Sequence, residues 1–230
     1  MADSELPPEV ALRSRPSRGG GEAPLTRERI VSEAVALLDE EGSAGLTMRR
    51  LAQRLRHGPT TLYWHVQTKD DVLDLALDAI FAEVVLPPES QDWRADLVAL
   101  LTQWRAVMVR HPWSATMVER PMLGPNVLAR TEFLHRAVLR AGLLGPRLIT
   151  AVHGLANYVI GSALSESQWR LRGDNARDSA AAYLWTERER YPTLVEHGYL
   201  TEHDWDASFT EGLGYLLDGM EGRARREDSV

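Results

Sequence analysis

The 230-residue chain contains no cysteine. Disulfide bonds, thiolate zinc sites and cysteine nucleophiles are therefore excluded. No apolar run approaches the roughly 20 residues that span a bilayer, and residues 1–25 lack the hydrophobic segment of a signal peptide. We therefore expect a soluble, cytoplasmic protein, and no residue pattern predicts a cofactor or a metal site.

Positive charge is scarce over most of the chain but concentrated near its start. The net charge is −7, which by itself argues against nucleic-acid binding. Residues 11–69, however, hold ten Lys or Arg against six Asp or Glu, whereas residues 70–230 hold sixteen against twenty-four. This distribution indicates a basic unit that can neutralise phosphates and an acidic remainder that DNA would repel.

Residues 46–73 have the pattern of two short helices joined by a turn. Thr47 is a good N-cap residue, and the apolar residues after it share one helical face: Leu51, Ala52 and Leu55. Gly58 terminates this helix, and Pro59 suits the first position of a second one. Leu62 and Val66 then lie four residues apart and point inward. The remaining side can donate to phosphates or touch base edges through Thr60, Thr61, Tyr63, Trp64 and His65.

The flanking sequence predicts two further helices. Thr26 can cap the earlier one, whose buried stripe is Ile30, Ala34, Leu37 and Leu38 and whose end is marked by Gly42. Thr68 and Asp71 have the spacing of a capping box, which opens a helix running through Ile80. We therefore expect a three-helix, helix-turn-helix DNA-binding domain over residues 26–72 and a linking helix over 73–86.

Residues 26–80 resemble the DNA-binding head of the tetracycline-repressor (TetR) family. The resemblance is carried by Ala34, Leu37-Leu38, Gly42, Leu46-Thr47, Arg50-Leu51-Ala52, Leu55, Leu62-Tyr63-Trp64-His65-Val66 and Lys69. It implies that Arg49 reaches a base edge and that Trp64 packs near the DNA backbone or the domain junction. It also implies contacts to phosphates or to the major groove from Thr47, Thr61, Tyr63, His65 and Lys69. Arg50 and Thr60 complete the DNA-binding set that we predict.

The sequence departs from the family pattern at four positions. Arg56-His57 stand where the family usually has Gly-Val, and Met48 and Pro59 occupy positions that are often polar and contact DNA. The resemblance therefore does not imply an operator sequence. Two simpler interpretations of the head also stay open: Arg54 and Arg56 as a solvated face, and Tyr63 and Trp64 as core aromatics.

Residues 1–25 are rich in Pro and Gly and cannot bury enough apolar surface to order themselves. We expect a flexible arm. Arg13, Arg15 and Arg18 could enter an adjacent minor groove of the DNA, or they could belong to a solvated tail.

The periodicity of residues 87–222 predicts a second helical domain, which makes the whole chain all-α. Helices are expected near residues 93–108, 113–118, 127–141, 147–169 and 205–220, followed by a tail over 223–230. The 147–169 helix is apolar almost all round, so we expect it to be buried on most sides. Small or apolar outer faces on the last two long helices indicate a partner subunit, and the resemblance implies a homodimer formed by four-helix packing.

The second domain is rich in aromatic residues and methionine, a composition that suits a cavity for a large flat ligand. The candidate ligand-binding residues are Trp104, Met108, Trp113, Met117 and Phe133, with His153, Asn157 and Ser165 as polar groups; each could instead be ordinary core. HPW at 111–113 and GPN at 124–126 are similar to the ligand domain of antibiotic-responsive repressors. For tetracycline itself the match fails, because no His stands where its magnesium would be held. A drug, a pathway product or another natural product remains open as effector.

Together these patterns predict a DNA-binding transcriptional regulator and not an enzyme: a homodimeric repressor released from a pseudo-palindromic operator by a small-molecule effector. Two alternatives stay open. A helical metalloenzyme would use the Glu-x-x-His unit of Glu132 and His135, but such sites need a second unit. A helical adaptor that had lost DNA binding would be expected to have a degraded head.

Overall fold

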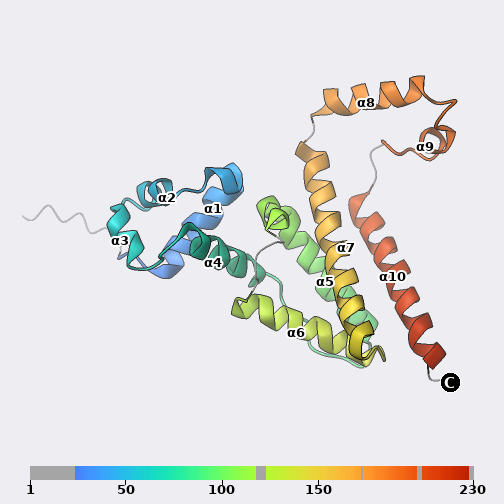
Figure 1. Ribbon diagram of the computed structural model, residues 1–230, viewed down its shortest axis with the longest axis horizontal. Helices are drawn as coiled ribbons and strands as arrows, with labels where there is room; N and C mark the ends of the chain where they lie inside the picture. Colours follow the sequence, from blue (N-terminus) through green and yellow to red (C-terminus); the bar gives the residue numbers. More distant parts are fainter. Residues whose placement is uncertain (1–23, 118–122, 172, 201–203, 228–230) are drawn as a thin grey trace, which may run out of the picture.

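The computed structural model describes residues 24–117, 123–171, 173–200 and 204–227, and every regular element among them is a helix. The all-α fold class is thereby confirmed. Figure 1 shows the four N-terminal helices as a compact head at one end of the molecule, with the long helices α7 and α10 side by side in the second domain. Residues 1–23 of the expected arm, with Arg13, Arg15 and Arg18, lie outside the described residues.

The head contains α1 (Arg27–Gly45), α2 (Met48–Arg54), α3 (Pro59–Tyr63) and the start of α4 (Lys69–Phe81). The three predicted caps are confirmed: the hydroxyls of Thr26, Thr47 and Thr68 accept hydrogen bonds from the backbone amides of Arg29, Arg50 and Asp71. The predicted inward residues are all buried: Ile30, Ala34, Leu37, Leu38, Leu51, Ala52, Leu55, Leu62 and Val66. Gly42 breaks α1 with a φ of 68°, and one more short turn follows before Gly45.

The linking helix is shorter than the sequence predicts. α4 begins at Lys69 with a complete capping box and ends at Phe81, so it crosses the boundary expected between residues 72 and 73 and stops before residue 86. Val84 is buried beyond this end, in a turn. Phe81 and Val84 both pack into the core, and the helix ends between them, several residues before Pro87.

The turn between α2 and α3 holds Arg56 in the left-handed region, with a φ of 58°. A side chain there costs about 1 kcal/mol that glycine avoids, and glycine is the residue expected at this position from the family pattern. Arg56→Gly should therefore raise the free energy of unfolding by about 1 kcal/mol, measured as a higher midpoint in urea denaturation. The matched control is Arg49→Gly, which places glycine in the helical conformation of α2 and should lower stability by a similar amount. A loss of stability in both variants would contradict the assignment of strain to Arg56.

The second domain is built from α5 (Trp93–Arg110), the 3₁₀ helix η1 (Pro112–Thr116), α6 (Pro125–Arg140), α7 (Gly145–Leu171) and α10 (Trp205–Glu227). α10 runs past Met220, so the expected tail over 223–230 is helical as far as Glu227. The sequence pattern did not reveal α8 (Asp174–Thr186) and α9 (Pro192–Glu196), which lie at the far end of α7 (Figure 1). None of the described side chains in α8 or α9 is fully buried, so they have no buried apolar stripe to identify them.

α7 differs from the sequence prediction in two ways. By length and composition it could cross a membrane, although we expected no such segment. It is also not buried on most sides within a single chain, because only 22% of its most apolar 18-residue window is buried. Its inner side packs on α5 and α10 and carries the buried carboxylate of Glu166, which is bound to Arg105 of α5. These contacts identify α7 as a helix of the bundle with one face left open.

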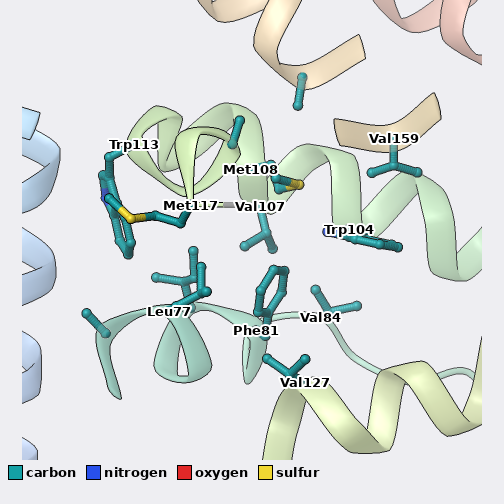
Figure 2. Packing of buried hydrophobic residues seen from close by; sticks show 14 of the residues in the cluster. Leu77, Phe81, Val84, Trp104, Val107, Met108, Trp113, Met117, Val127 and Val159 are labelled. Atoms are coloured by element: carbon teal, nitrogen blue, oxygen red, sulfur yellow. The ribbon is translucent and has the colours of Figure 1, made fainter. Parts of the chain in front are cut away.

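The core continues from the head into the second domain through α4. Figure 2 shows Phe81 among Val84, Val107 and Val127, so side chains from α4, α5 and α6 pack in one cluster. The rings of Phe81 and Trp104 meet edge to face, with centroids 6.2 Å apart. A change in the packing of the second domain can therefore act directly on the end of α4.

Candidate functional site: the helix-turn-helix surface

Two buried anchors, Leu62 in α3 and Val66 just after the turn that follows it, fix which side chains of this segment face solvent. Leu62 is fully buried and Val66 is nearly so, whereas Tyr63 is 50% exposed and Trp64 is 85% exposed. The interpretation of Tyr63 and Trp64 as core aromatics is therefore wrong. Thr60, Thr61 and His65 are exposed beside them. This segment thus presents aromatic rings and hydrogen-bonding groups to solvent together, as a surface that reads DNA requires.

The arginines of α2 and the following turn fall into two groups. Arg50 pairs with Glu41 of α1, and Arg54 reaches Glu33 at 2.6 Å and Glu40 at 2.5 Å. The hydrogen bond from Arg54 lowers the pKa of the Glu40 carboxyl. The structure thus gives Arg50 and Arg54 a role in joining α2 to α1.

The exposed residues Arg49 and Arg56 form the second group. Neither side chain makes a hydrogen bond or an ion pair with any residue that the structure describes. Their positive charge is therefore available to a phosphate or a base. The sequence left open whether Arg54 and Arg56 are only a solvated face, because the pairing of Arg54 depends on the position of α1.

Thr47 and Lys69 each make one bond inside the head. The Thr47 oxygen accepts from the Arg50 amide at 3.2 Å, which leaves its own hydroxyl proton able to bond to a phosphate. The Lys69 ammonium donates to the Ser43 carbonyl at 2.9 Å, so α4 is tied to the end of α1. Since an ammonium has three donors, two remain for other acceptors.

The structure divides the expected ligand-binding residues into two groups. Five lie buried in the hydrophobic core: Trp104, Met108, Trp113, Met117 and Phe133. His153, Asn157 and Ser165 are exposed on α7. Asn157 and Ser165 line a groove of about 380 Å³ beside Trp205 of α10. The eight residues therefore do not line one cavity.

The HPW and GPN segments both contact helices of the head. His111 and the indole nitrogen of Trp113 bind the Asp39 carboxylate of α1 at 2.8 and 2.7 Å, and His111 also reaches Glu83 just after α4. These contacts form the first joint between the two domains.

The second joint lies at the start of α6. Asp78 of α4 accepts from the backbone amides of Asn126 and Val127 at 2.9 and 3.0 Å, and from the Asn126 side chain at 2.9 Å. A Cβ on Gly124 would lie 2.1 Å from the Asp78 carboxylate, so this close approach requires glycine. These bonds join the start of α6 directly to α4.

The Glu-x-x-His unit does not form the start of a metal site. Glu132 is exposed, and the Nδ1 atom of His135 lies 2.7 Å from the Thr131 carbonyl on its own helix. Over the described ranges, no group of three or more His, Asp or Glu residues is placed to hold a metal ion.

The head and the second domain together define a helix-turn-helix DNA-binding regulator. Residues 30–76 match the model of bacterial regulatory proteins of the tetR family, and residues 86–224 match the tetracycline repressor-like C-terminal domain. The second match alone spans more than half of the chain. The chain belongs to the TetR family of transcriptional regulators, as its sequence indicates.

Relatives with this organisation are bacterial regulators. An HTH-type transcriptional regulator of Saccharopolyspora erythraea is 45% identical over 223 residues, which cover 96% of this chain and 92% of that protein. The HTH-type transcriptional repressor DrrR1 of Streptomyces coeruleorubidus is 33% identical, with 90% of this chain and 81% of that protein covered. The structure of ActR from Streptomyces coelicolor in complex with actinorhodin has a TM-score of 0.77 and 33% identity, covering 88% of this chain and 99% of that one.

Proposed function

We propose that this regulator is a cytoplasmic homodimeric repressor that holds a pseudo-palindromic operator and releases it when a natural-product effector binds. The observation that carries the proposal is the exposed surface of α3, where Leu62 and Val66 turn Tyr63, Trp64 and His65 outward. Two such heads would enter successive major grooves about one helical turn apart. Blocking of a promoter then represses transcription, and no catalytic step is involved.

The open faces of α7 and α10 support a dimer. A mainly apolar groove of about 450 Å³ lies between them, lined by Leu143, Ala151, Leu216 and Met220, with Arg147 and Arg223 also lining it. Ile149 of α7 and Tyr215 of α10 are also exposed. A second copy of the chain would cover these side chains by four-helix packing, because a two-fold interface pairs the same face of each subunit.

The operator contacts that we propose follow the exposed groups of the head. Arg49 reads a base edge. Trp64 packs against the DNA backbone, and contacts to phosphates or to the groove come from Thr47, Arg50, Thr60, Thr61, Tyr63, His65 and Lys69. For Arg50 such a contact requires it to leave Glu41 or to share its charge.

The effector is proposed to act through the two joints between the domains. ActR has been crystallised with actinorhodin, which supports a natural product as the class of effector. A ligand that shifts α6 or η1 would pull on Asp78 or Asp39 and change the spacing of the two heads. Because the coupling is reciprocal, bound operator would weaken effector binding by the same factor.

Lys69→Ala should weaken binding to all duplexes and reduce the slope of log affinity against log salt by about 0.9, the value of one phosphate contact. The measurement is a fluorescence-anisotropy titration at several salt concentrations. Arg54→Ala is the control, because Glu33 and Glu40 already neutralise Arg54 and the slope should stay close to the wild-type value. An unchanged slope in Lys69→Ala would contradict the phosphate contact.

The test of the proposal as a whole is selection of bound sequences from a random duplex pool by the purified chain, repeated without residues 1–23. Recovery of an inverted repeat supports a dimeric operator-binding protein. Recovery of no sequence by folded protein would overturn it and favour the adaptor alternative. A difference between the two selections would assign a contact to the segment that carries Arg13, Arg15 and Arg18.

A further inference from the structure

A buried arginine lies where the head joins the second domain. Arg130 of α6 is only 3% exposed, and its guanidinium carbon lies 3.9 Å from the ring centroid of Phe81 and 3.8 Å from that of Trp104. Phe81 ends α4 and Trp104 belongs to α5, and Figure 2 shows both rings in the core between these helices. The cation is thus enclosed by aromatic rings from two other helices.

The donors of this cluster lack acceptors. The Nε and Nη1 atoms of Arg130 and the indole nitrogen of Trp104 are buried without a hydrogen-bond partner among the described residues. Asp78 attracts the guanidinium, but its carboxylate already accepts from Asn126 and Val127. Burial lowers the pKa of Arg130 to about 9, and the attraction of Asp78 opposes this shift. At neutral pH the site therefore holds a cation with unused donors. If Arg130 served only to pack the core, this unpaired charge would destabilise the fold without any benefit.

We propose that Arg130 and Trp104 form the polar end of the effector site, and that the effector is a flat aromatic molecule carrying an anionic oxygen. The anion would accept from the guanidinium and the indole, and the flat framework would pack on the same rings that now enclose Arg130. This inference rests on the proposed function, because it assigns the chemistry of the ligand that the second domain takes. The sequence pattern placed Trp104 and Met108 in the ligand site but gave no signal for Arg130.

The position of Arg130 also connects the effector to the DNA-binding head. Asp78 and Phe81 lie one turn apart on α4; Asp78 holds the start of α6, and Phe81 contacts the guanidinium. An anion bound to Arg130 would compete with Asp78 for the positive charge and displace the Phe81 ring. Both changes act on α4, whose other end carries Lys69 and its bond to α1. Since Arg130 is enclosed, entry of the effector requires this core to rearrange.

The first test compares acids with their neutral amides on the full chain. The probes are 2-naphthoate, anthracene-2-carboxylate and anthraquinone-2-carboxylate, each with its carboxamide, titrated by Trp fluorescence and calorimetry. At least one acid should bind about 10- to 100-fold more tightly than its amide, as expected for a hydrogen bond to a charged group. Arg130→Met should remove this preference, and Arg130→Lys should retain part of it. Equal binding of acid and amide in every pair, or no binding at all, would overturn the proposal.

The second test is the stability of the same variants without any probe. If Arg130 serves a ligand, Arg130→Met removes an unpaired buried charge while keeping contact with the rings, and the melting temperature should rise by a few degrees. A purely structural arginine would give a fall, which would count against the proposal. Operator binding, measured by gel shift, separates a failure of the proposed function from a failure of this inference. If the wild-type protein binds no operator, the proposed function is wrong. If it binds operator but binds the acids no more tightly than their amides, only this inference is wrong.

Discussion

Leu216→Glu is expected to convert the protein to a monomer and to lower operator affinity by roughly 1,000-fold or more. Leu216 is 38% exposed on α10 and lines the apolar groove beside α7. At a two-fold interface the new carboxylates would enter an apolar contact from both subunits, which is costly for each charge. A monomer then holds one half-site and loses the contacts of the second head. Analytical ultracentrifugation measures the first effect and gel shift on the selected operator measures the second.

The control for this variant is Leu139→Glu. Leu139 is 48% exposed on α6 and takes no part in lining the groove, so its replacement tests the cost of an exposed Leu-to-Glu change alone. We expect the Leu139 variant to stay dimeric and to bind operator normally. If both variants bind operator like the wild type, α7 and α10 do not form the dimer contact.

Glu166→Ala is expected to lower the free energy of unfolding by about 3–5 kcal/mol, the range for breaking a buried ion pair. Glu166 of α7 and Arg105 of α5 are both buried and form an ion pair. Arg105 also donates to Asp206 of α10 at 2.5 Å and to Ser162 at 3.1 Å. Removal of Glu166 leaves a buried guanidinium that keeps only one, exposed carboxylate partner. The loss is a large part of the roughly 5–15 kcal/mol that holds a typical domain together.

Urea denaturation of two further variants separates the cost of leaving a buried charge unpaired from the cost of losing an ion-pair contact. Arg94→Ala breaks a more exposed pair with Asp218 and should cost at most about 1 kcal/mol. The double variant Arg105→Met with Glu166→Leu should be more stable than Glu166→Ala, because it leaves no unpaired charge in the core. Equal losses in Glu166→Ala and Arg94→Ala would mean that Glu166 is not the buried partner the structure assigns.

The local elements of the head were predictable from the sequence because they depend on short-range rules. A threonine cap needs only the three residues after it, and the inward direction of Leu62 and Val66 follows from their spacing of four, one helical turn apart. The three caps and both anchors are present as predicted. The exposure of Tyr63 and Trp64 follows from the same spacing.

The roles of the charged residues were decided by the tertiary structure. Arg54 binds Glu33, which lies 21 positions away in the sequence, and Arg105 binds Glu166, which lies 61 positions away. No helical period relates such partners, so the sequence could not separate Arg54 from Arg56. For the same reason the expected ligand residues were divided between the core and exposed positions on α7, and Arg130 was not predicted at all.

The sequence by itself thus determined the helices of the head, their caps and the exposed side of the helix-turn-helix, since these follow from the order of residues along one helix or turn. The tertiary structure alone decided which arginines are neutralised, which face of α7 is left exposed, and where an unsatisfied cation lies between α4, α5 and α6. The physical reason is that burial and pairing depend on contacts between helices that are distant in the chain.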